Sequence, residues 1–300
     1  MQAPIGPATT TALVTAVSSA GGLGTLAASW TEPEKLREQL QRIRSQLDER
    51  PFCVNLVLAF DQRERLTIAL AEGSPAISFS WGVDHDLFAQ ARSAGAIVLA
   101  QVADVGAARE AVSAGADILI AQGFEAGGHV QGKTPLLELV HALRDVGLPI
   151  VAAGGIGDAA VARRALDAGA DAVACGTAFL AAEEANVHAA YLDAVISANA
   201  ADTVLTTAFD GDWPDAPHRV IRNNTLTAWE SAGCPPAGAR PGEGEIVATL
   251  GRHPIERYAD AQPTRSTAGD VGAMAMYAGT SVGAVIRRAP AAEITRQLAV

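Results

Sequence analysis

The stretch Asp117-Ile118-Leu119-Ile120-Ala121-Gln122-Gly123-Phe124-Glu125-Ala126-Gly127-Gly128-His129 indicates how the whole chain folds. It begins as an apolar run that carries isoleucine or leucine on both faces, a pattern typical of a parallel strand covered on both sides. It ends in a glycine-rich turn that presents one histidine. Because α/β sheets and barrels bind ligands where such strands end, we expect a ligand beside this turn.

The residues of this turn suit close contact with a ligand. Gly127 and Gly128 lack a Cβ, so their backbone can take positive φ or lie against a cofactor. His129 has an ordinary pKa near neutrality and is open to three interpretations. It is a general base, a positively charged hydrogen-bond donor, or a surface residue on a glycine loop. The glycines around it favour a functional role.

Similar strand–helix units occur along the first 182 residues. The first predicted strand covers residues 1–5, and residues 20–26 form the turn into the second. The other predicted strands cover 52–58, 76–80, 96–102, the run from Asp117, 149–153 and 171–175. Alternation of strands and helices predicts a parallel sheet. Eight units favour a closed (β/α)8 TIM barrel, since a Rossmann sheet more often has about six strands.

The clearest predicted helix spans residues 31–49. Thr31 and Glu34 have the spacing of a capping box, and Pro33 suits the first turn. Four apolar residues share one face of the helix, and they are Leu36, Leu40, Ile43 and Leu47.

The pattern changes after the eighth unit. We predict three parts: a cofactor-binding barrel over 1–182, a lid or insertion over the barrel mouth at 183–268, and C-terminal helices over 269–300, the last packing back on the barrel. The C-terminal excursion is expected to be small and mostly helical, with a strand over 203–209. Residues 269–287 and 290–298 are the predicted C-terminal helices.

Composition narrows the classes of partner. The formal charge is −11, with both signs mixed along the chain, which argues against nucleic acid or an anionic membrane. The three cysteines are scattered and show no metal spacing, so we expect no metal and a reducing cytoplasm. No apolar run suggests a signal peptide or a membrane span. A homo-oligomer is compatible with all of this.

Two further glycine turns follow the seventh and eighth predicted strands, Gly154-Gly155-Ile156-Gly157 and Gly176-Thr177. In barrels this pair of loops often binds phosphate through backbone N–H groups. The alternative is a pair of tight turns without a ligand. Three carboxamides, Asn55, Gln101 and Gln122, end other strands at the same mouth. A carboxamide offers a donor and an acceptor, so it can bind a heterocycle or simply cap a strand.

These motifs resemble the nitronate monooxygenase family, formerly 2-nitropropane dioxygenases. The resemblance rests on the segments 2–5, 20–24, 122–129, 152–156, 175–177, 277–283 and 290–294. It is most specific at the Glu-Ala-Gly-Gly-His turn, 125–129. The sequence departs from the family at Ile5, where methionine is frequent, at Ala178, where arginine is common, and over 210–218, which is longer than usual.

The resemblance implies an FMN-dependent TIM-barrel oxidoreductase that oxidises alkyl nitronates with O2, without a metal. In it His129 acts as base or as electrostatic partner of the nitronate. The residues expected at the cofactor are Ala3, Pro4, Ile5, Asn55, Gln101, Gln122, Gly127, Gly128, Ala153, Gly154, Gly155, Cys175, Gly176 and Thr177.

Two other functions fit the same residues. A flavin reductase of the enoyl-acyl-carrier-protein type uses the same barrel and would take hydride from NAD(P)H. The third possible function is that of a barrel that binds a phosphorylated ligand without redox chemistry. The colour of the purified protein distinguishes it from the two flavin enzymes.

Overall fold

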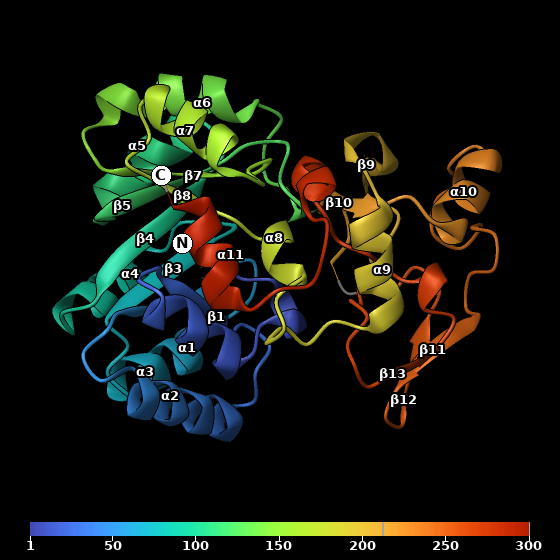
Figure 1. Cartoon of the computed structure of the whole chain (residues 1–300), viewed down its shortest axis with the longest axis horizontal. Helices are drawn as coiled ribbons and strands as arrows, with labels where there is room; N and C mark the ends of the chain where they lie inside the picture. The colour runs from blue at the N-terminus through green and yellow to red at the C-terminus, as the bar shows by residue number, and fades with distance from the viewer. Residues whose placement is uncertain (212, 300) are drawn as a thin grey trace.

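The computed structural model describes residues 1–211 and 213–299, and its main sheet forms the left half of Figure 1. The sheet is parallel and runs in the order β1-β2-β3-β4-β5-β7-β8. Its strands are β1 Gly24–Ala27, β2 Phe52–Val57, β3 Ala76–Ser80, β4 Ile97–Val102, β5 Ile118–Gln122, β7 Ile150–Ala153 and β8 Ala172–Ala174.

The first residues of the chain close this sheet into a barrel. Gln2 forms a parallel bridge with Cys175, directly after β8. The backbone N–H of Gln2 also donates to the carbonyl of Leu23, directly before β1, at 2.9 Å. Residues 1–3 therefore act as the eighth strand between β8 and β1. The predicted (β/α)8 barrel is confirmed.

Helices surround the barrel (Figure 1). They are α1 Thr11–Ser19, α2 Pro33–Leu47, α3 Arg63–Ala71, α4 His85–Ser93, α5 Val105–Ala114, α6 Leu136–Leu143 and α7 Ala159–Asp167. The short α8, Thr177–Leu180, follows β8. The outer position after β8 is filled by α11, Ala291–Leu298, which contacts α1 and α7.

Helix α2 shows what the sequence pattern captured and what it missed. Its four predicted face residues are all buried, at no more than 1% exposure. The predicted capping box of Thr31 and Glu34 is wrong. The N-cap is Glu32, whose side chain makes no capping hydrogen bond. Because the helix begins at Pro33, Thr31 lies one residue too early to cap it.

Apolar side chains also fill the inside of the barrel. One cluster takes a single buried residue from each of six strands, namely Cys53, Ala76, Leu99, Ile120, Val151 and Ala174. A second, larger cluster packs the outside of the sheet against the helices. The barrel is therefore a solid core, and ligand chemistry belongs at its carboxyl edge.

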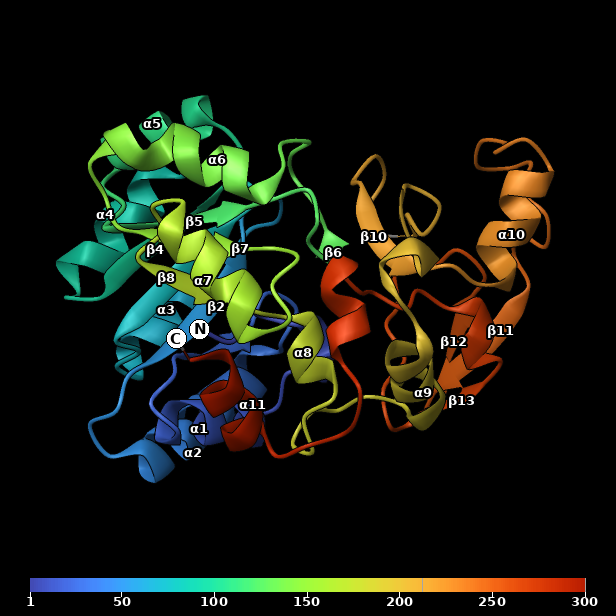
Figure 2. The ribbon, with the colours of Figure 1, turned by 45° about the horizontal axis from the view of Figure 1, so that its top comes forward.

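The excursion lies beside the barrel in Figures 1 and 2 and is more mixed than the sequence pattern indicates. It holds α9 Ala189–Ser197 and α10 Asn224–Ser231, but also most of two three-stranded antiparallel sheets, ordered β6-β10-β9 and β12-β11-β13. Strand β6 comes from the turn after β5. The strands of these sheets are β6 Gly128–His129, β9 Thr203–Thr206, β10 His218–Ile221, β11 Ile246–Leu250, β12 His253–Glu256 and β13 Thr267–Gly269. The predicted strand at 203–209 is present as β9.

The segment 269–287 is not the helix that its composition suggests. It begins at Gly269, the end of β13, and its helical structure is limited to two 3-10 turns, η4 Val271–Ala273 and η5 Thr280–Ala284. Glycines recur there at short intervals, and glycine disfavours a continuous helix because of its backbone entropy. The division of the chain at residues 182 and 268 stays a prediction. Within the described residues, every helix is too short or too polar to span a bilayer.

Candidate active site

His129 lies where the barrel meets the excursion. The turn after β5 leads into β6, and β6 pairs with β10 so that His129 stands opposite His218. Figure 2 shows β6 on the side of the barrel that faces the excursion. The histidine predicted from the turn is therefore held between two parts of the chain far apart in sequence.

Carboxamides hold this turn in place. The Gln122 side chain donates from Nε2 to the carbonyl of His129 at 3.0 Å and accepts from the backbone N–H of Gln131 at 3.0 Å. Gln101 donates to Oε1 of Gln131 at 2.7 Å. The predicted residues Gln101 and Gln122 thus lie together, and the hydrogen bonds that they make within the protein fix the backbone on both sides of the histidine.

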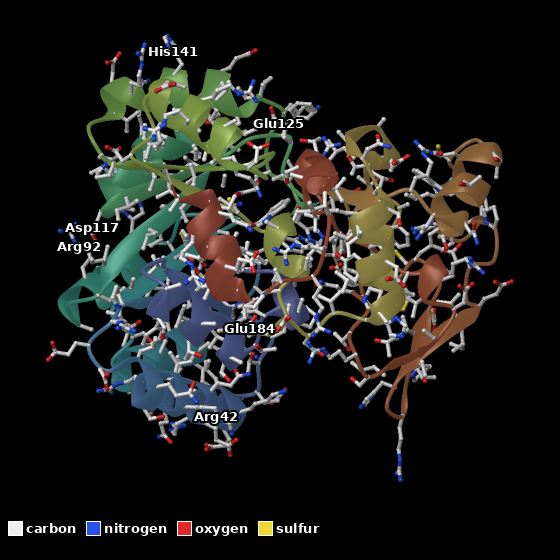
Figure 3. All side chains as sticks on the ribbon, in the orientation of Figure 1. Arg42, Arg92, Asp117, Glu125, His141 and Glu184 are labelled. Carbon is white, nitrogen blue, oxygen red and sulfur yellow. The ribbon has the colours of Figure 1, made fainter. Side chains whose placement is uncertain are left out.

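Glu125 anchors the other side of the turn. Its carboxylate accepts the backbone N–H of Leu136, the first residue of α6, at 3.0 and 3.2 Å. Arg219 donates to the carbonyl of Phe124 at 2.9 Å and lies over the Phe124 ring. Figure 3 places Glu125 at the junction, whereas the labelled Arg42, Arg92 and His141 lie on the outer helices. Glu125 and Arg219 are structural anchors here.

Aromatic rings enclose the imidazole. The Trp213 ring stacks on His129 with centroids 4.4 Å apart and an interplanar angle of 24°. Trp81 lies edge-on to His129 at 6.1 Å and contacts Trp213 at 4.6 Å. His218 and Tyr277 follow at 5.3 and 5.7 Å. The surroundings of His129 are thus largely apolar.

This burial controls the charge of His129. Burial is the larger cause and the neighbouring His218 the smaller, and together they lower the pKa of His129 to about 3. The Asp260 carboxylate lies 3.7 Å from Nε2, which is too long for a hydrogen bond. His129 is therefore a neutral imidazole near pH 7.

His218 has a structural role. Burial lowers its pKa as well. Its Nδ1 bonds the carbonyl of Ala216 at 2.9 Å, and its Nε2 accepts the N–H of Phe209 at 3.2 Å. With both ring nitrogens bonded to backbone, His218 supports the loop and leaves His129 as the histidine with a ring nitrogen to offer.

Trp81 occupies a strained position directly after β3. Its φ is +62°, a region that bulky L-residues rarely adopt. Such strain persists only where the surrounding structure fixes it, and it gathers at functional sites. Here the strained backbone directs an indole against His129 and Trp213.

The two predicted phosphate turns are neighbours, because β7 pairs with β8 up to Ala153 and Ala174. Among the described residues, the backbone N–H groups of Gly155, Gly176 and Thr177 donate to no partner. Gly155 has φ of +70° and lies against Glu125, where a Cβ would come within 2.9 Å of its Cβ. Free amides on adjacent turns fit a phosphate, which accepts several N–H groups at once.

Other predicted cofactor residues serve the packing of the protein. A Cβ on Gly127 would come within 2.3 Å of the backbone nitrogen of Gly279, so Gly127 permits two backbones to touch. The Thr177 hydroxyl accepts the N–H of Gly279 at 2.9 Å. Gly128 has φ of +72° and open space beside it. Glycine is favoured at this position because of its positive φ, since there is room for a side chain.

The remaining predicted residues surround the same mouth. Ala3 donates its N–H to the carbonyl of Cys175 at 2.9 Å, and Pro4 follows it. A Cβ built on Gly176 would lie 3.5 Å from Ile5 and 3.7 Å from Ala3. Gly154, after Ala153, packs its Cα against the Gly123–Ala126 turn. Asn55 donates from Nδ2 to the Ser78 hydroxyl at 3.1 Å.

Four residues of the site were not predicted from the sequence, namely Trp81, Trp213, Asp260 and Tyr277. Tyr277 stands in the family-like segment 277–283, which was a signal for it. Trp213 stands in the segment 210–218, where the sequence was expected to depart from the family. Nothing in the sequence pattern points to Asp260, which follows β12 and reaches His129 only through the fold. In the described part of the chain, no group of three or more His, Cys, Asp or Glu side chains could hold a metal ion.

Comparisons with known proteins cover the whole chain. The profile of the family described as nitronate monooxygenase matches residues 1–63 and 58–300. A nitronate monooxygenase of Pseudomonas aeruginosa is 32% identical, over 99% of this chain and 94% of that protein. A (3aS,4S,5R,7aS)-5-hydroxy-7a-methyl-1-oxo-octahydro-1H-indene-4-carboxyl-CoA dehydrogenase of Mycobacterium tuberculosis is 34% identical over 73% of this chain, which spans only 61% of that relative.

Solved structures agree with the fold. FabK from Thermotoga maritima superposes with a TM-score of 0.80 at 28% identity, covering 98% of this chain and 90% of that one. The nitroalkane oxidase from Streptomyces ansochromogenes gives 0.78 at 29% identity, covering 99% and 93%.

Proposed function

The chain belongs to the nitronate monooxygenase family, and from this premise we propose that it is an FMN-dependent enzyme that oxidises alkyl nitronates with O2. Enzymes of this family are flavin-dependent oxidoreductases that act on small molecules. The FMN, the nitronate and the roles of individual residues are the proposal.

The observation that carries the proposal is the state of His129. Its imidazole is buried, neutral, and enclosed by Trp81 and Trp213, and it lies on the turn that follows β5. Its Nε2 has no hydrogen-bond partner among the described residues. A neutral imidazole offers an unprotonated ring nitrogen, and the anionic nitronate formed beside it would stabilise the imidazolium.

The cofactor would be held by the adjacent turns. The free amides of Gly155, Gly176 and Thr177 would bind the FMN phosphate, and Asn55 and the segment 3–5 would lie along the flavin. When bound, the flavin would supply the transfer of electrons from the nitronate to O2. The protein supplies position, exclusion of water and the proton acceptor.

His129 then has a defined task. With a neutral nitroalkane, its ring nitrogen takes the proton from the α-carbon, and the C–H electron pair becomes the C=N bond of the nitronate. The resulting imidazolium pairs with the nitronate that it has made. A nitronate supplied as the anion needs no such proton transfer, so its oxidation depends less on His129.

The His129→Ala variant tests this proposal. We expect it to keep its FMN, measured by releasing the flavin from the denatured protein. We expect its turnover of a neutral nitroalkane to fall by about 10²-fold or more, the usual contribution of a general base. Equal turnover by the variant and the parent protein would remove His129 from the reaction.

The similarity to FabK favours a second candidate, a flavin reductase of the enoyl-acyl-carrier-protein type that oxidises NAD(P)H. The same turn and the same histidine would serve it. Reduction of the flavin by NAD(P)H is the observation that separates the two candidates.

We also propose that the enzyme works in a reducing cytoplasm. Cys53, Cys175 and Cys234 are free thiols in the described structure, and Cys234 is exposed. Exposed free thiols suit a reducing compartment.

A further inference from the structure

The His129 imidazole has a carboxylate neighbour that the sequence pattern does not indicate. Asp260 Oδ2 lies 3.7 Å from His129 Nε2, and the side chains are only 14% and 16% exposed for His129 and Asp260, respectively. His129 Nε2 is buried without a hydrogen bond to any described residue. A buried ring nitrogen without a partner costs free energy, so a slight closure of this pair would be favourable.

The Asp260 carboxylate has a fixed orientation. Its Oδ1 accepts a hydrogen bond from the hydroxyl of Tyr277. Burial and the Asp260 charge together raise the pKa of Tyr277, so that hydroxyl remains a donor. Tyr277 itself is held by an antiparallel bridge to Val220 of β10. With Oδ1 directed to Tyr277, Oδ2 is the oxygen that faces His129.

Resting on the proposed function, we propose that Asp260 is a positioning residue that keeps the proton of His129 on Nε2 and so leaves the lone pair of Nδ1 as the base. The α-proton of a nitroalkane moves to Nδ1, and its C–H electron pair stays on the substrate as the nitronate. The ring is then an imidazolium, with its Nε2–H directed at the Asp260 carboxylate. Hydrogen bonds of this kind are often long before substrate binds.

The other described groups around the His129 ring are not suited to hold the proton on Nε2. From β10, His218 faces His129, but both of its ring nitrogens are bonded to backbone. From the segments after β3 and β9, Trp81 and Trp213 contribute only indole rings. Within the described residues, Asp260 is the only charged partner of His129 within 4.0 Å. Tyr277 acts on the ring through that carboxylate.

The Asp260→Asn variant separates charge from shape. Its carboxamide oxygen would remain with the Tyr277 hydroxyl, because that hydroxyl is a donor. Its NH2 group would then face His129 Nε2 and donate to it. The proton would move to Nδ1, and the base would be lost although the geometry is kept. A histidine with the wrong tautomer loses its catalytic function in the same way in serine proteases.

Nitrogen NMR of the protein labelled at its histidine rings measures which ring nitrogen of His129 carries the proton. The His129→Gln variant assigns the signal of this residue. We expect the parent protein to carry the proton on Nε2 and Asp260→Asn to carry it on Nδ1. Asp270→Asn, the same change at an exposed carboxylate, should keep the parent tautomer. The same tautomer in the parent and Asp260→Asn would overturn the proposal. If Asp260→Asn does not fold, Tyr277→Phe replaces it and should give a mixture of tautomers, whereas a pure Nε2–H signal would count against us.

Kinetics give a second readout. We expect Asp260→Asn to lower kcat/KM for a neutral nitroalkane at least about tenfold more than for the preformed nitronate. Equal losses on both substrates would contradict the proposal. If the parent protein oxidises neither compound, the proposed function fails, and the NMR result still decides the position of the proton.

Discussion

The indole of Trp213 stacks on the imidazole of His129, with ring centroids 4.4 Å apart. Trp213 comes from the segment between β9 and β10. Its ring also contacts Phe60 and Trp81. Trp213 therefore covers one face of the imidazole, and we expect substrate that reaches His129 to meet this ring.

Replacing this indole should widen the range of substrates. We expect Trp213→Ala to raise kcat/KM for a nitronate with a long alkyl chain by about tenfold relative to nitroethane anion, since each methylene accommodated is worth about 1–3 kcal/mol. Competition between the two nitronates measures this ratio. Trp30→Ala is the control. Trp30 is 57% exposed and contacts Phe60, which in turn contacts Trp213. An unchanged ratio in Trp213→Ala would show that Trp213 does not line the substrate path.

Asp210, three residues before Trp213, is held by the buried Arg240. Arg240 forms two 2.7 Å hydrogen bonds with the Asp210 carboxylate and one of 3.0 Å with the carbonyl of Ala208. Arg240→Ala should cost about 1.5–3 kcal/mol, the usual value of hydrogen bonds to charged groups, and should loosen Trp213. Chemical denaturation and tryptophan fluorescence would measure the two effects.

The matched control for Arg240 is Arg222→Ala. Arg222 pairs with Glu230, and both side chains are at least one third exposed, so little stability should be lost. If Arg240→Ala behaved like Arg222→Ala in both measurements, the buried Arg240–Asp210 pair would not be what holds Trp213 in place.

The turn after β7 should determine cofactor affinity. Gly155→Ala introduces a Cβ at φ of +70° and within 2.9 Å of Glu125 Cβ, so the turn must shift. We expect FMN to bind at least about tenfold more weakly, because a phosphate contact worth 1.4 kcal/mol or more is disturbed. Titration of the flavin-free protein with FMN measures this.

Gly147→Ala is a control with similar backbone strain. Gly147 has φ of +86° with nothing within 4 Å, and it precedes β7, at the opposite end from Gly155. It should lose stability but keep its FMN affinity. Equal loss of affinity in both variants would mean that strain, rather than the phosphate turn, explains the result.

Acid should destabilise the protein in part through His129. Its pKa is about 3 in the folded protein and near 6.5 when unfolded. The unfolded chain therefore binds one more proton between these values, so stability is complete above pH 6.5 and is lost as the pH falls toward 3. The slope from this one group is at most about 1.4 kcal/mol per pH unit. Urea unfolding at pH 7 and pH 5 should show a smaller loss for His129→Gln than for the parent protein, and an equal loss would contradict a buried neutral ring.

The barrel was predictable because each of its units repeats the same local signals. The strand 76–80 was predicted with its observed bounds, and Asp84, Asp104 and Asp158 cap the helices they precede. His129 and the turns at 154–157 and 176–177 were also predictable, because barrel topology places the ends of all parallel strands at one mouth.

The rest of the site depends on contacts that sequence spacing does not encode. Asp260 and Trp213 come from the excursion, more than 80 residues after His129, and only the packing of two small sheets brings them to it. Gln122 was expected at the flavin, yet its polar atoms hold the His129 turn. A carboxamide at a strand end has the same sequence signature in either role. The burial that makes His129 neutral is likewise a tertiary property.

The central claim is that this enzyme takes its electrons from a nitronate. Its most direct test is to mix the purified protein, reconstituted with FMN if necessary, anaerobically with a preformed nitronate and separately with NADH and NADPH, and to follow the visible absorbance of the flavin. We predict bleaching by the nitronate alone. Bleaching by NADH or NADPH without bleaching by the nitronate would contradict the account and identify a reductase.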